Sequence, residues 1–386
     1  MIAQASYPGD PRIRREAEAL EKAGCEIDVL CRPSGSQAKV EKFGNVTAYR
    51  ITKAPSQENI LKWIYYSSLF LIKSFWKIQF LYLKRRYNVI HVHNLPDFLV
   101  FAATFQKLLR VPVILDLHDL SVELFRSKWQ NKKGTFLLSV IRVIEYFSCK
   151  FANHIITTSE GFAQRLISRG VPKEKITIIY NTPVSKHFYF NDCRKFSIIN
   201  SNAVLLYHGT VSRRFGLDIA IKALPLIHKH VPGTRLIVFG KYEKRYKEEL
   251  KRISQELNVD KYVELNDVIP IDKVLKEINL ADFGLVPYVE NEFMNLALST
   301  KGFEYATAGL PVIASSLDPM KKIFDVNSVA YITPSDFNDL ASKVVHLCKE
   351  PTIRKQMSIN ANDAIKGISW GLMEKRIYNL VNILVK

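Results

Sequence analysis

Short apolar runs rich in β-branched residues alternate along the chain with segments in which apolar residues recur every three or four positions. The runs predict strands and the periodic segments predict helices. In residues 12–23, for example, Ile13, Ala17 and Leu20 share one helical face, and Gly24 suits a C-terminal cap. Strands that alternate with helices form parallel sheets covered on both faces, so the pattern predicts an α/β protein.

The alternation occurs twice, which predicts two doubly wound domains in tandem. The first series predicts strands at residues 26–31, 46–51, 88–92, 113–115, 155–158 and 176–179. The second predicts strands at residues 203–207, 235–239, 262–265, 283–286, 312–314 and 329–332, and helices at 217–230, 246–257, 272–278, 300–308, 337–349, 351–366 and 370–385. Residues 186–202 break the rhythm. We therefore expect an N-terminal domain over residues 1–185, a linker over 186–202 and a C-terminal domain over 203–367.

The composition is that of a globular protein, with 47% apolar and 24% charged residues. Lys and Arg number 55 against 37 Asp and Glu, and the resulting charge of +18 favours nucleotides, anionic lipid or nucleic acid as partners. A basic surface that serves only solubility is the alternative. The sequence contains no recognisable nucleic-acid-binding module, so we expect no nucleic acid partner.

Cellular location is predicted from three sequence features. The five cysteines form no Cys-x2-Cys pair, which indicates reduced thiols in a cytosolic protein. The N-terminus lacks the pattern of a signal peptide, and no run of about 18 apolar residues could span a membrane. We expect a cytoplasmic protein.

Six segments carry candidate chemistry, in the order YPGDPRIRREAEALEKAG (7–24), HVHNLPD (91–97), VILDLHDLSVEL (113–124), HGTVSRRFGLD (208–218), ADFGLVPY (281–288) and KGFEYATAGLPVIAS (301–315). Together they resemble retaining glycosyltransferases of family 4, the group 1 glycosyltransferases, in the branch that builds exopolysaccharide, capsule or lipopolysaccharide. The resemblance covers nearly the whole chain. It implies the GT-B fold, in which two Rossmann-like domains face a central cleft and a C-terminal helix, here residues 368–386, crosses back to the first domain.

The resemblance also implies a nucleotide-diphosphate sugar as donor, a saccharide or lipid-linked saccharide as acceptor, and no cofactor or essential metal. The transferred group would be a hexosyl unit. The sequence contains no D-x-D motif, the metal-nucleotide signature of the other large transferase fold, which agrees with a metal-independent reaction.

The donor diphosphate requires positive charge and backbone N–H groups at a helix N-terminus. The segment around Gly209 supplies two arginines, Arg213 and Arg214, before a predicted helix. Relatives often carry Arg and Lys where this chain has Thr210 and Phe215, so the two arginines are expected to carry more of the diphosphate. The alternative is a solvated basic loop.

The segment before Glu304 offers further donor contacts. In the family, the carboxylate matching Glu304 accepts hydrogen bonds from the donor ribose. The family's second Glu would stand where this chain has Leu296, so Ser299, Thr300 and Lys301 are expected to contribute instead. Lys301 and Glu304 are three residues apart and share a helical face. A carboxylate on the helix surface is the alternative for Glu304.

Histidine and acidic residues of the first half are candidates for the reaction and the acceptor. In the family, a histidine matching His118 approaches the donor sugar or the acceptor, and a neutral imidazole can donate or accept there. His118 could instead satisfy local backbone groups. Asp119 and Glu123 could position an acceptor hydroxyl or cap the next helix.

The loop after the first strand, with Gly9, Asp10 and Arg12, faces the cleft in the family, although Asp10 could simply cap the following helix. His91 and His93 share one face of a strand end. That spacing can suit a metal, but no third ligand is apparent. We expect no metal, and expect His93 to line or pack against the cleft.

Residues 61–87 interleave lysines and arginines with aromatic residues. Such a helix suits an anionic membrane surface, and predicts peripheral association with the inner face of the plasma membrane. The alternative is a core helix whose lysines face water. A nucleotide-sugar epimerase or hydrolase of the same fold, or a binding protein without turnover, are the alternative functions.

Overall fold

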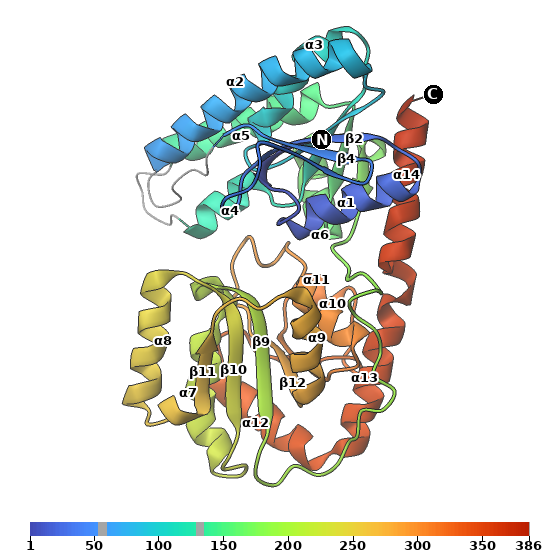
Figure 1. Ribbon diagram of the computed structural model, residues 1–386. Coiled ribbons are helices and arrows are strands. Elements are labelled where there is room, and N and C mark those ends of the chain that lie inside the picture. Colours follow the sequence, from blue (N-terminus) through green and yellow to red (C-terminus); the bar gives the residue numbers. More distant parts are fainter. Residues whose placement is uncertain (53–59, 129–134, 386) are drawn as a thin grey trace. The chain divides into compact units, whose positions relative to one another are not determined.

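The computed structural model describes residues 1–52, 60–128 and 135–385. The chain forms two compact units (Figure 1). The first contains Met1–Asn181 and Gly371–Lys386, and the second contains Thr182–Trp370. Each unit is a sheet with helices on both faces, so the predicted α/β class is confirmed.

The sheet of the first unit has the strand order β3-β4-β2-β1-β5-β6-β7-β8. Its strands are β1 (Ile2–Ser6), β2 (Ile27–Arg32), β3 (Val40–Phe43), β4 (Val46–Arg50), β5 (Ile90–His93), β6 (Val113–Leu117), β7 (His154–Thr157) and β8 (Ile176–Ile178). All of its strand pairs are parallel except β3 with β4. The sequence analysis missed β3 because alternate exposed residues on this short edge strand leave no apolar run.

Helices connect these strands. They are α1 (Pro11–Lys22), α2 (Ile60–Arg85), the 3-10 helix η1 (Asp97–Ala103), α3 (Thr104–Leu108), α4 (Ser121–Lys128), α5 (Thr135–Phe151), α6 (Glu160–Ser168) and the 3-10 helix η3 (Lys173–Lys175). Both α2 and α5 pack on η1. No helix among the described residues is long and apolar enough to cross a membrane.

The sheet of the second unit is parallel throughout, with the order β11-β10-β9-β12-β13-β14. Its strands are β9 (Val204–Val211), β10 (Arg235–Tyr242), β11 (Val263–Asn266), β12 (Phe283–Val286), β13 (Val312–Ser315) and β14 (Ala330–Ile332). Both β9 and β10 extend past their predicted ends because they pair along their whole length, as far as Val211 with Tyr242.

The helices of the second unit are η4 (Arg213–Phe215), α7 (Leu217–His228), α8 (Lys244–Glu256), η5 (Asp260–Tyr262), α9 (Ile271–Leu280), α10 (Thr300–Thr307), α11 (Asp318–Lys321), α12 (Phe337–Lys349), α13 (Pro351–Ile365) and η6 (Lys366–Ile368). The segment expected as a linker lies in this unit. There Arg194 donates to the carbonyl oxygens of Ile278 and Ala281, and the N–H of Ile199 donates to Cys348.

The last helix, α14 (Trp370–Val385), is part of the first unit although it follows the second along the chain. Met373 and Ile377 are buried. The sulfur of Met373 accepts a hydrogen bond from the N–H of Tyr180, and Arg376 donates to the carbonyl oxygen of Ile178. The predicted return of the C-terminal helix to the first domain is therefore observed.

Both sheets reverse their strand order at one point, between β1 and β5 in the first unit and between β9 and β12 in the second. Ligands of doubly wound sheets bind at the carboxyl ends of the strands at such a reversal. In the second unit this point is flanked by His208 to Thr210, in the last half of β9, and by Pro287 and Tyr288 after β12.

Candidate functional site

The reversal point of the second sheet brings a histidine beside the predicted ribose-binding carboxylate. His208 lies in β9 and Glu304 in α10, and the imidazole Nε2 lies 3.2 Å from a carboxylate oxygen of Glu304. Burial, together with the ammonium of Lys301, lowers the pKa of His208 to about 3. His208 is therefore neutral at physiological pH, and Glu304 keeps a partly accessible side chain beside it.

Lys301 is held among aromatic rings. Its Nζ lies 4.9 Å from the ring centroids of Tyr207 and Phe215 and 5.5 Å from that of Tyr288. Ring faces attract a cation without neutralising it, so the positive charge stays available to a ligand. Phe215, which stands where relatives often carry Lys, thus helps to hold the lysine of α10.

Gly209 allows the close approach of strand and lysine. Its φ of +106° is a conformation that L side chains rarely adopt, and a Cβ at this position would lie 3.3 Å from the Nζ of Lys301. The sequence analysis assigned Gly209 to the donor site, and the structure places its backbone directly beside the caged lysine.

The N-terminus of α10 lies in the same neighbourhood. Ser299 caps this helix by accepting a hydrogen bond from the N–H of Gly302, and its hydroxyl pairs with that of Tyr288 at 2.9 Å. Thr300 and Lys301 begin the first turn, whose free backbone N–H groups favour anions. Tyr288 contacts both Ser299 and Lys301, so this side chain joins the capped N-terminus of α10 to the aromatic rings around Lys301.

The two arginines of the donor loop have different surroundings. Arg213 is exposed and forms an ion pair with Glu249 of α8, with Nη1 at 2.8 Å from one carboxylate oxygen. Arg214 stacks near the rings of Phe215 and Phe293, at 5.0 and 5.3 Å. Its Nε and Nη1 are buried and have no hydrogen-bond partner among the described residues. Arg214 is thus the arginine with hydrogen-bonding capacity to spare.

In the first unit, Arg12 is buried in an ion-pair network. Its guanidinium donates to both carboxylate oxygens of Asp116, at 2.7 and 2.9 Å, and lies 3.0 Å from Glu16. Although burial favours the neutral acid, Arg12 and His93 hold the pKa of Asp116 well below its usual value. Burial raises the pKa of Glu16 well above its usual value. The structure therefore places Arg12 in the core, joining α1 to β6.

His91 and His93 stack on each other within this network, with ring centroids 4.3 Å apart. Glu16 and Asp116 lie close enough to complete a set of four possible metal ligands, two more than the sequence suggested. Within this set the guanidinium of Arg12 holds both oxygens of Asp116 and supplies a compensating positive charge. The Nδ1 atom of His93 lies 3.1 Å from a carboxylate oxygen of Asp116, and the side chain is buried.

His118 directly follows the carboxyl end of β6. Its N–H donates to the side chain of Asn94 and its carbonyl oxygen accepts from Thr158, both at 3.2 Å. These bonds use the backbone, and the Nδ1 atom of the imidazole is buried without a hydrogen-bond partner among the described residues. The ring is partly accessible and remains a candidate for the reaction.

The remaining predicted acceptor residues have local or structural partners. Asp10 caps α1 by accepting hydrogen bonds from the N–H groups of Arg12 and Ile13, the alternative considered for it. Gly9 packs against Ser6, whose Oγ would lie 2.4 Å from an added Cβ. The carbonyl oxygen of Asp119 accepts from Asn94.

Glu123 is fully buried in α4 and forms ion pairs with Arg165 and Arg169. This carboxylate therefore joins α4 to α6. Among the described residues, the Glu123 side chain forms no hydrogen bond or ion pair with His118.

Two family models match the chain. The model described as Glycosyltransferase Family 4 matches residues 12–182, and the model described as Glycosyl transferases group 1 matches residues 202–350. Each model thus covers most of one structural unit.

The curated relatives are also glycosyltransferases. Chitobiosyldiphosphodolichol beta-mannosyltransferase of Kluyveromyces lactis is 24% identical over 45% of this chain and 38% of that enzyme. The enzyme of the same name from Candida glabrata is 19% identical over 91% of this chain and 83% of its own. Alpha-galactosylglucosyldiacylglycerol synthase of Streptococcus pneumoniae is 22% identical over 72% of each chain.

Solved structures share the fold over nearly the whole length. Sucrose-phosphate synthase of Thermosynechococcus elongatus superposes with a TM-score of 0.78 at 18% identity, over 99% of this chain and 98% of that one. Anabaena HepE, in complex with UDP and glucose, gives a TM-score of 0.73 at 14% identity over the same shares. The chain therefore belongs to the glycosyltransferases of the GT-B fold, with a family 4 N-terminal half and a group 1 C-terminal half.

Proposed function

We propose that this protein transfers a hexosyl group from a nucleotide-diphosphate sugar to a saccharide acceptor, without a metal. The observation that carries the proposal is a pair of cations at the reversal point of the second sheet, Lys301 and Arg214, neither of which forms an ion pair with a described residue. A diphosphate supplies the negative charge that such a site lacks. The complexes of HepE with UDP and with UDP-glucose show that a protein of this fold takes such ligands.

Each part of the donor is assigned to its own group of residues. Lys301, Arg214 and the N–H groups at the start of α10 hold the diphosphate, with Gly209 giving room for it and Ser299 and Thr300 forming the turn. Glu304 accepts hydrogen bonds from the ribose hydroxyls, and the neutral His208 orients it. Arg213 contributes less to diphosphate binding, because the diphosphate would have to compete with Glu249 for its guanidinium.

In the proposed reaction the acceptor hydroxyl attacks the anomeric carbon from the face that the diphosphate leaves. The bond from the anomeric carbon to the diphosphate oxygen breaks, and the acceptor proton passes to the departing phosphate. The new glycosidic bond therefore retains the configuration of the donor. In this proposal His118 serves as a hydrogen-bonding group for the sugar, and Gly9, Asp10 and Asp119 contribute to binding of the acceptor.

The acceptor is proposed to be a lipid-linked saccharide of cell-surface polysaccharide synthesis, used at the cytoplasmic face of the membrane. The exposed face of α2 supports this location. Ile72, Trp76, Phe80 and Leu83 are all more than half exposed and follow one another at helical spacing. The opposite face packs into the domain through Phe70, Ile78 and Leu81. The S. pneumoniae relative is named an alpha-galactosylglucosyldiacylglycerol synthase, which agrees with a lipid acceptor.

A thermal-shift screen against a panel of nucleotide sugars tests the donor site. A donor present at about 100 times its Kd stabilises the protein by about 2.7 kcal/mol. Glu304→Ala is expected to abolish the shift, and its circular dichroism and its melting temperature without ligand show whether the variant is folded. Glu256→Ala, an exposed carboxylate of α8, is the matched control and keeps the shift. An unchanged shift in Glu304→Ala contradicts the placement of the ribose.

Labelled donor, with and without membrane extract, then tests the reaction. Transfer that requires the extract supports a transferase. Conversion of the donor without an acceptor supports an epimerase or hydrolase of this fold, and binding without release of nucleotide diphosphate supports a protein without turnover.

A further inference from the structure

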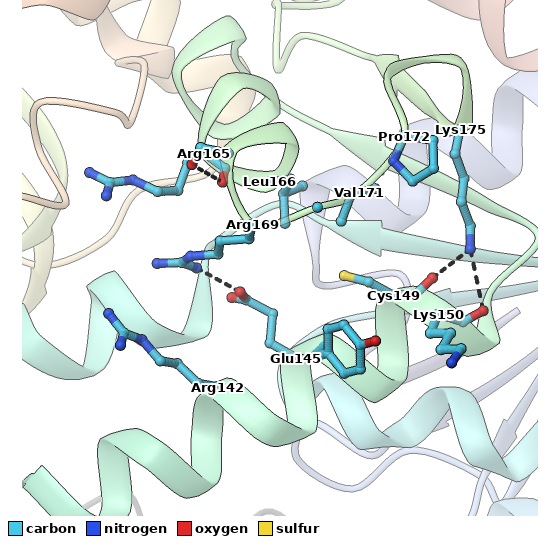
Figure 2. Close-up of a pocket in the computed structure, with 13 residues that line it drawn as sticks. Arg142, Glu145, Cys149, Lys150, Arg165, Leu166, Arg169, Val171, Pro172 and Lys175 are labelled. Carbon is cyan, nitrogen blue, oxygen red and sulfur yellow. Dashed lines mark hydrogen bonds and ion pairs between the residues drawn. The ribbon is translucent and has the colours of Figure 1, made fainter.

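A cavity of about 660 Å³ lies in the first unit between α5 and α6 (Figure 2). It is separate from every residue placed in the donor site. One wall is α5, and the other is the end of α6 with the turn that leads to β8. Arg165, Arg169 and Lys175 enter it from the second wall, and Arg142, Glu145 and Lys150 from the first.

The lining is strongly basic. Five of these side chains are cations and one is a carboxylate. Arg169 donates to Glu145 at 2.6 Å and also pairs with Glu123, so both carboxylates are held by an arginine. Burial, with Asp97 nearby, raises the pKa of Glu145 to about 7. Glu145 therefore carries only part of a negative charge near neutral pH, and the cavity keeps a net positive charge.

Two of the cations have no hydrogen-bond or ion-pair partner among the described residues. Lys175 is not one of them, because its ammonium donates a hydrogen bond to the carbonyl oxygen of Cys149, at the end of α5, at 2.6 Å. Arg142 and Lys150, in contrast, are exposed and make no side-chain hydrogen bond or ion pair within the described part of the chain. Figure 2 shows the guanidinium of Arg142 on the same side of the cavity as those of Arg165 and Arg169. Planar guanidinium groups arranged in this way match the oxygens of a phosphate.

The outer face of α5 beside the cavity is apolar. Val143, Tyr146 and Phe147 are each more than half exposed, and Lys150 continues the same helical face. Aromatic rings next to lysine and arginine are typical of surfaces that sit at the headgroup level of a bilayer.

We propose that this cavity binds the phosphate headgroup of an anionic membrane lipid, whose acyl chains lie over the apolar face of α5. Basic groups inside and an apolar rim outside fit an amphiphilic phosphate better than a free ion, which would use only the basic groups. Arg142 contacts the phosphate together with the arginines of α6, and Lys150, about two turns further along α5, attracts the anionic headgroup from the other end of the cavity. The proposal does not rest on glycosyl transfer, because none of these residues takes part in it.

Calorimetry with dihexanoylphosphatidylglycerol below its critical micelle concentration tests the site without a bilayer, so that α2 does not contribute through a membrane surface. The variant is Arg142→Ala with Lys150→Ala, which removes no ion pair of the described residues. Lys39→Ala with Lys42→Ala, two exposed lysines at the edge strand of the same unit, removes equal charge elsewhere. Charge-assisted contacts to a phosphate are among the strong hydrogen bonds of proteins, so the first variant is expected to bind at least tenfold more weakly.

The control variant is expected to bind like the wild type, and the zwitterionic dihexanoylphosphatidylcholine is expected to bind at least tenfold more weakly. Equal losses in the two double variants would mean diffuse charge attraction and would overturn the proposal. Inorganic phosphate that binds as tightly as the short-chain lipid would overturn the assignment to a lipid.

A variant that fills the cavity tests the location independently of charge. Ser168 lines the cavity from the exposed end of α6, so Ser168→Trp blocks it and leaves every cation in place. Binding of dihexanoylphosphatidylglycerol is expected to fall at least tenfold, while the far-ultraviolet circular dichroism stays that of the wild type. Undiminished binding in a folded Ser168→Trp protein would exclude the cavity.

Discussion

At the scale of single residues, the proposed donor site depends on two charges that no ion pair with the described part of the chain neutralises. Lys301 lies among three rings and Arg214 between two, and aromatic faces hold a cation without cancelling it. Arg213 has the same charge, but its guanidinium forms an ion pair with Glu249. Neighbouring arginines in one loop thus have unequal capacity for a diphosphate.

The pH dependence of stability at His208 follows from its burial. Its folded pKa is about 3 against an ordinary value near 6.5. The unfolded state therefore binds more protons between these values, and the stability is fully present above about pH 6.5 and lost as pH falls towards 3. From pH 7 to pH 5 this residue should cost about 2 kcal/mol of unfolding free energy.

Urea denaturation of the wild type and of His208→Gln at both pH values measures this contribution. The glutamine cannot titrate, so the variant is expected to lose less stability than the wild type on acidification, by about 2 kcal/mol. Parallel pH profiles for the two proteins would show that the imidazole is not held neutral.

At the scale of elements, α2 has one face that packs into its unit and one face that is exposed. Its inner residues pack on the sheet and on η1, and its outer residues expose large apolar side chains among lysines. Exposed aromatic area of this extent is unusual unless a partner covers it. A bilayer surface suits it because the neighbouring lysines attract anionic lipid.

Replacement of Trp76 and Phe80 by serine tests α2. Because both side chains are more than half exposed, the two changes together should leave the unfolding free energy within about 1 kcal/mol of wild type. Co-sedimentation with phosphatidylglycerol vesicles is expected to weaken about tenfold or more, since two apolar contacts of roughly 1 kcal/mol each are lost.

The control for α2 replaces Leu280 and Val326, two exposed apolar residues of the second unit, by serine. It should sediment with vesicles like the wild type. If both double variants lost the same affinity, general surface hydrophobicity would account for the binding and α2 would have no special part.

At the scale of the whole molecule, the chain order and the structural units differ. The chain leaves the first unit after Asn181, forms the second, and returns with α14. Residues near both ends of the sequence therefore belong to the same unit, where Lys22 of α1 forms an ion pair with Glu374 of α14.

Met373→Ala tests this dependence. The side chain is fully buried in the first unit, so its truncation should destabilise that unit by about 2–5 kcal/mol. Hydrogen exchange followed by mass spectrometry should then accelerate in β1 to β8 and remain unchanged in β9 to β14. Equal acceleration in both sheets would mean that the two units unfold together.

The sequence by itself determined the α/β class, the two series of strands and most of the helix positions, because apolar periodicity is a local property of the chain. It also indicated Gly209, Lys301 and Glu304, since the resemblance follows motifs that are continuous in sequence.

Tertiary structure alone decided which side chains meet. Arg12 lies in the core because Asp116, 104 residues away, lies beside it, and Lys301 is caged by rings from separate elements. His208 was missed although it directly precedes Gly209 at a strand end, because its value depends on contact with Glu304. Long-range contacts of this kind depend on how the strands are ordered, and no local pattern encodes that order.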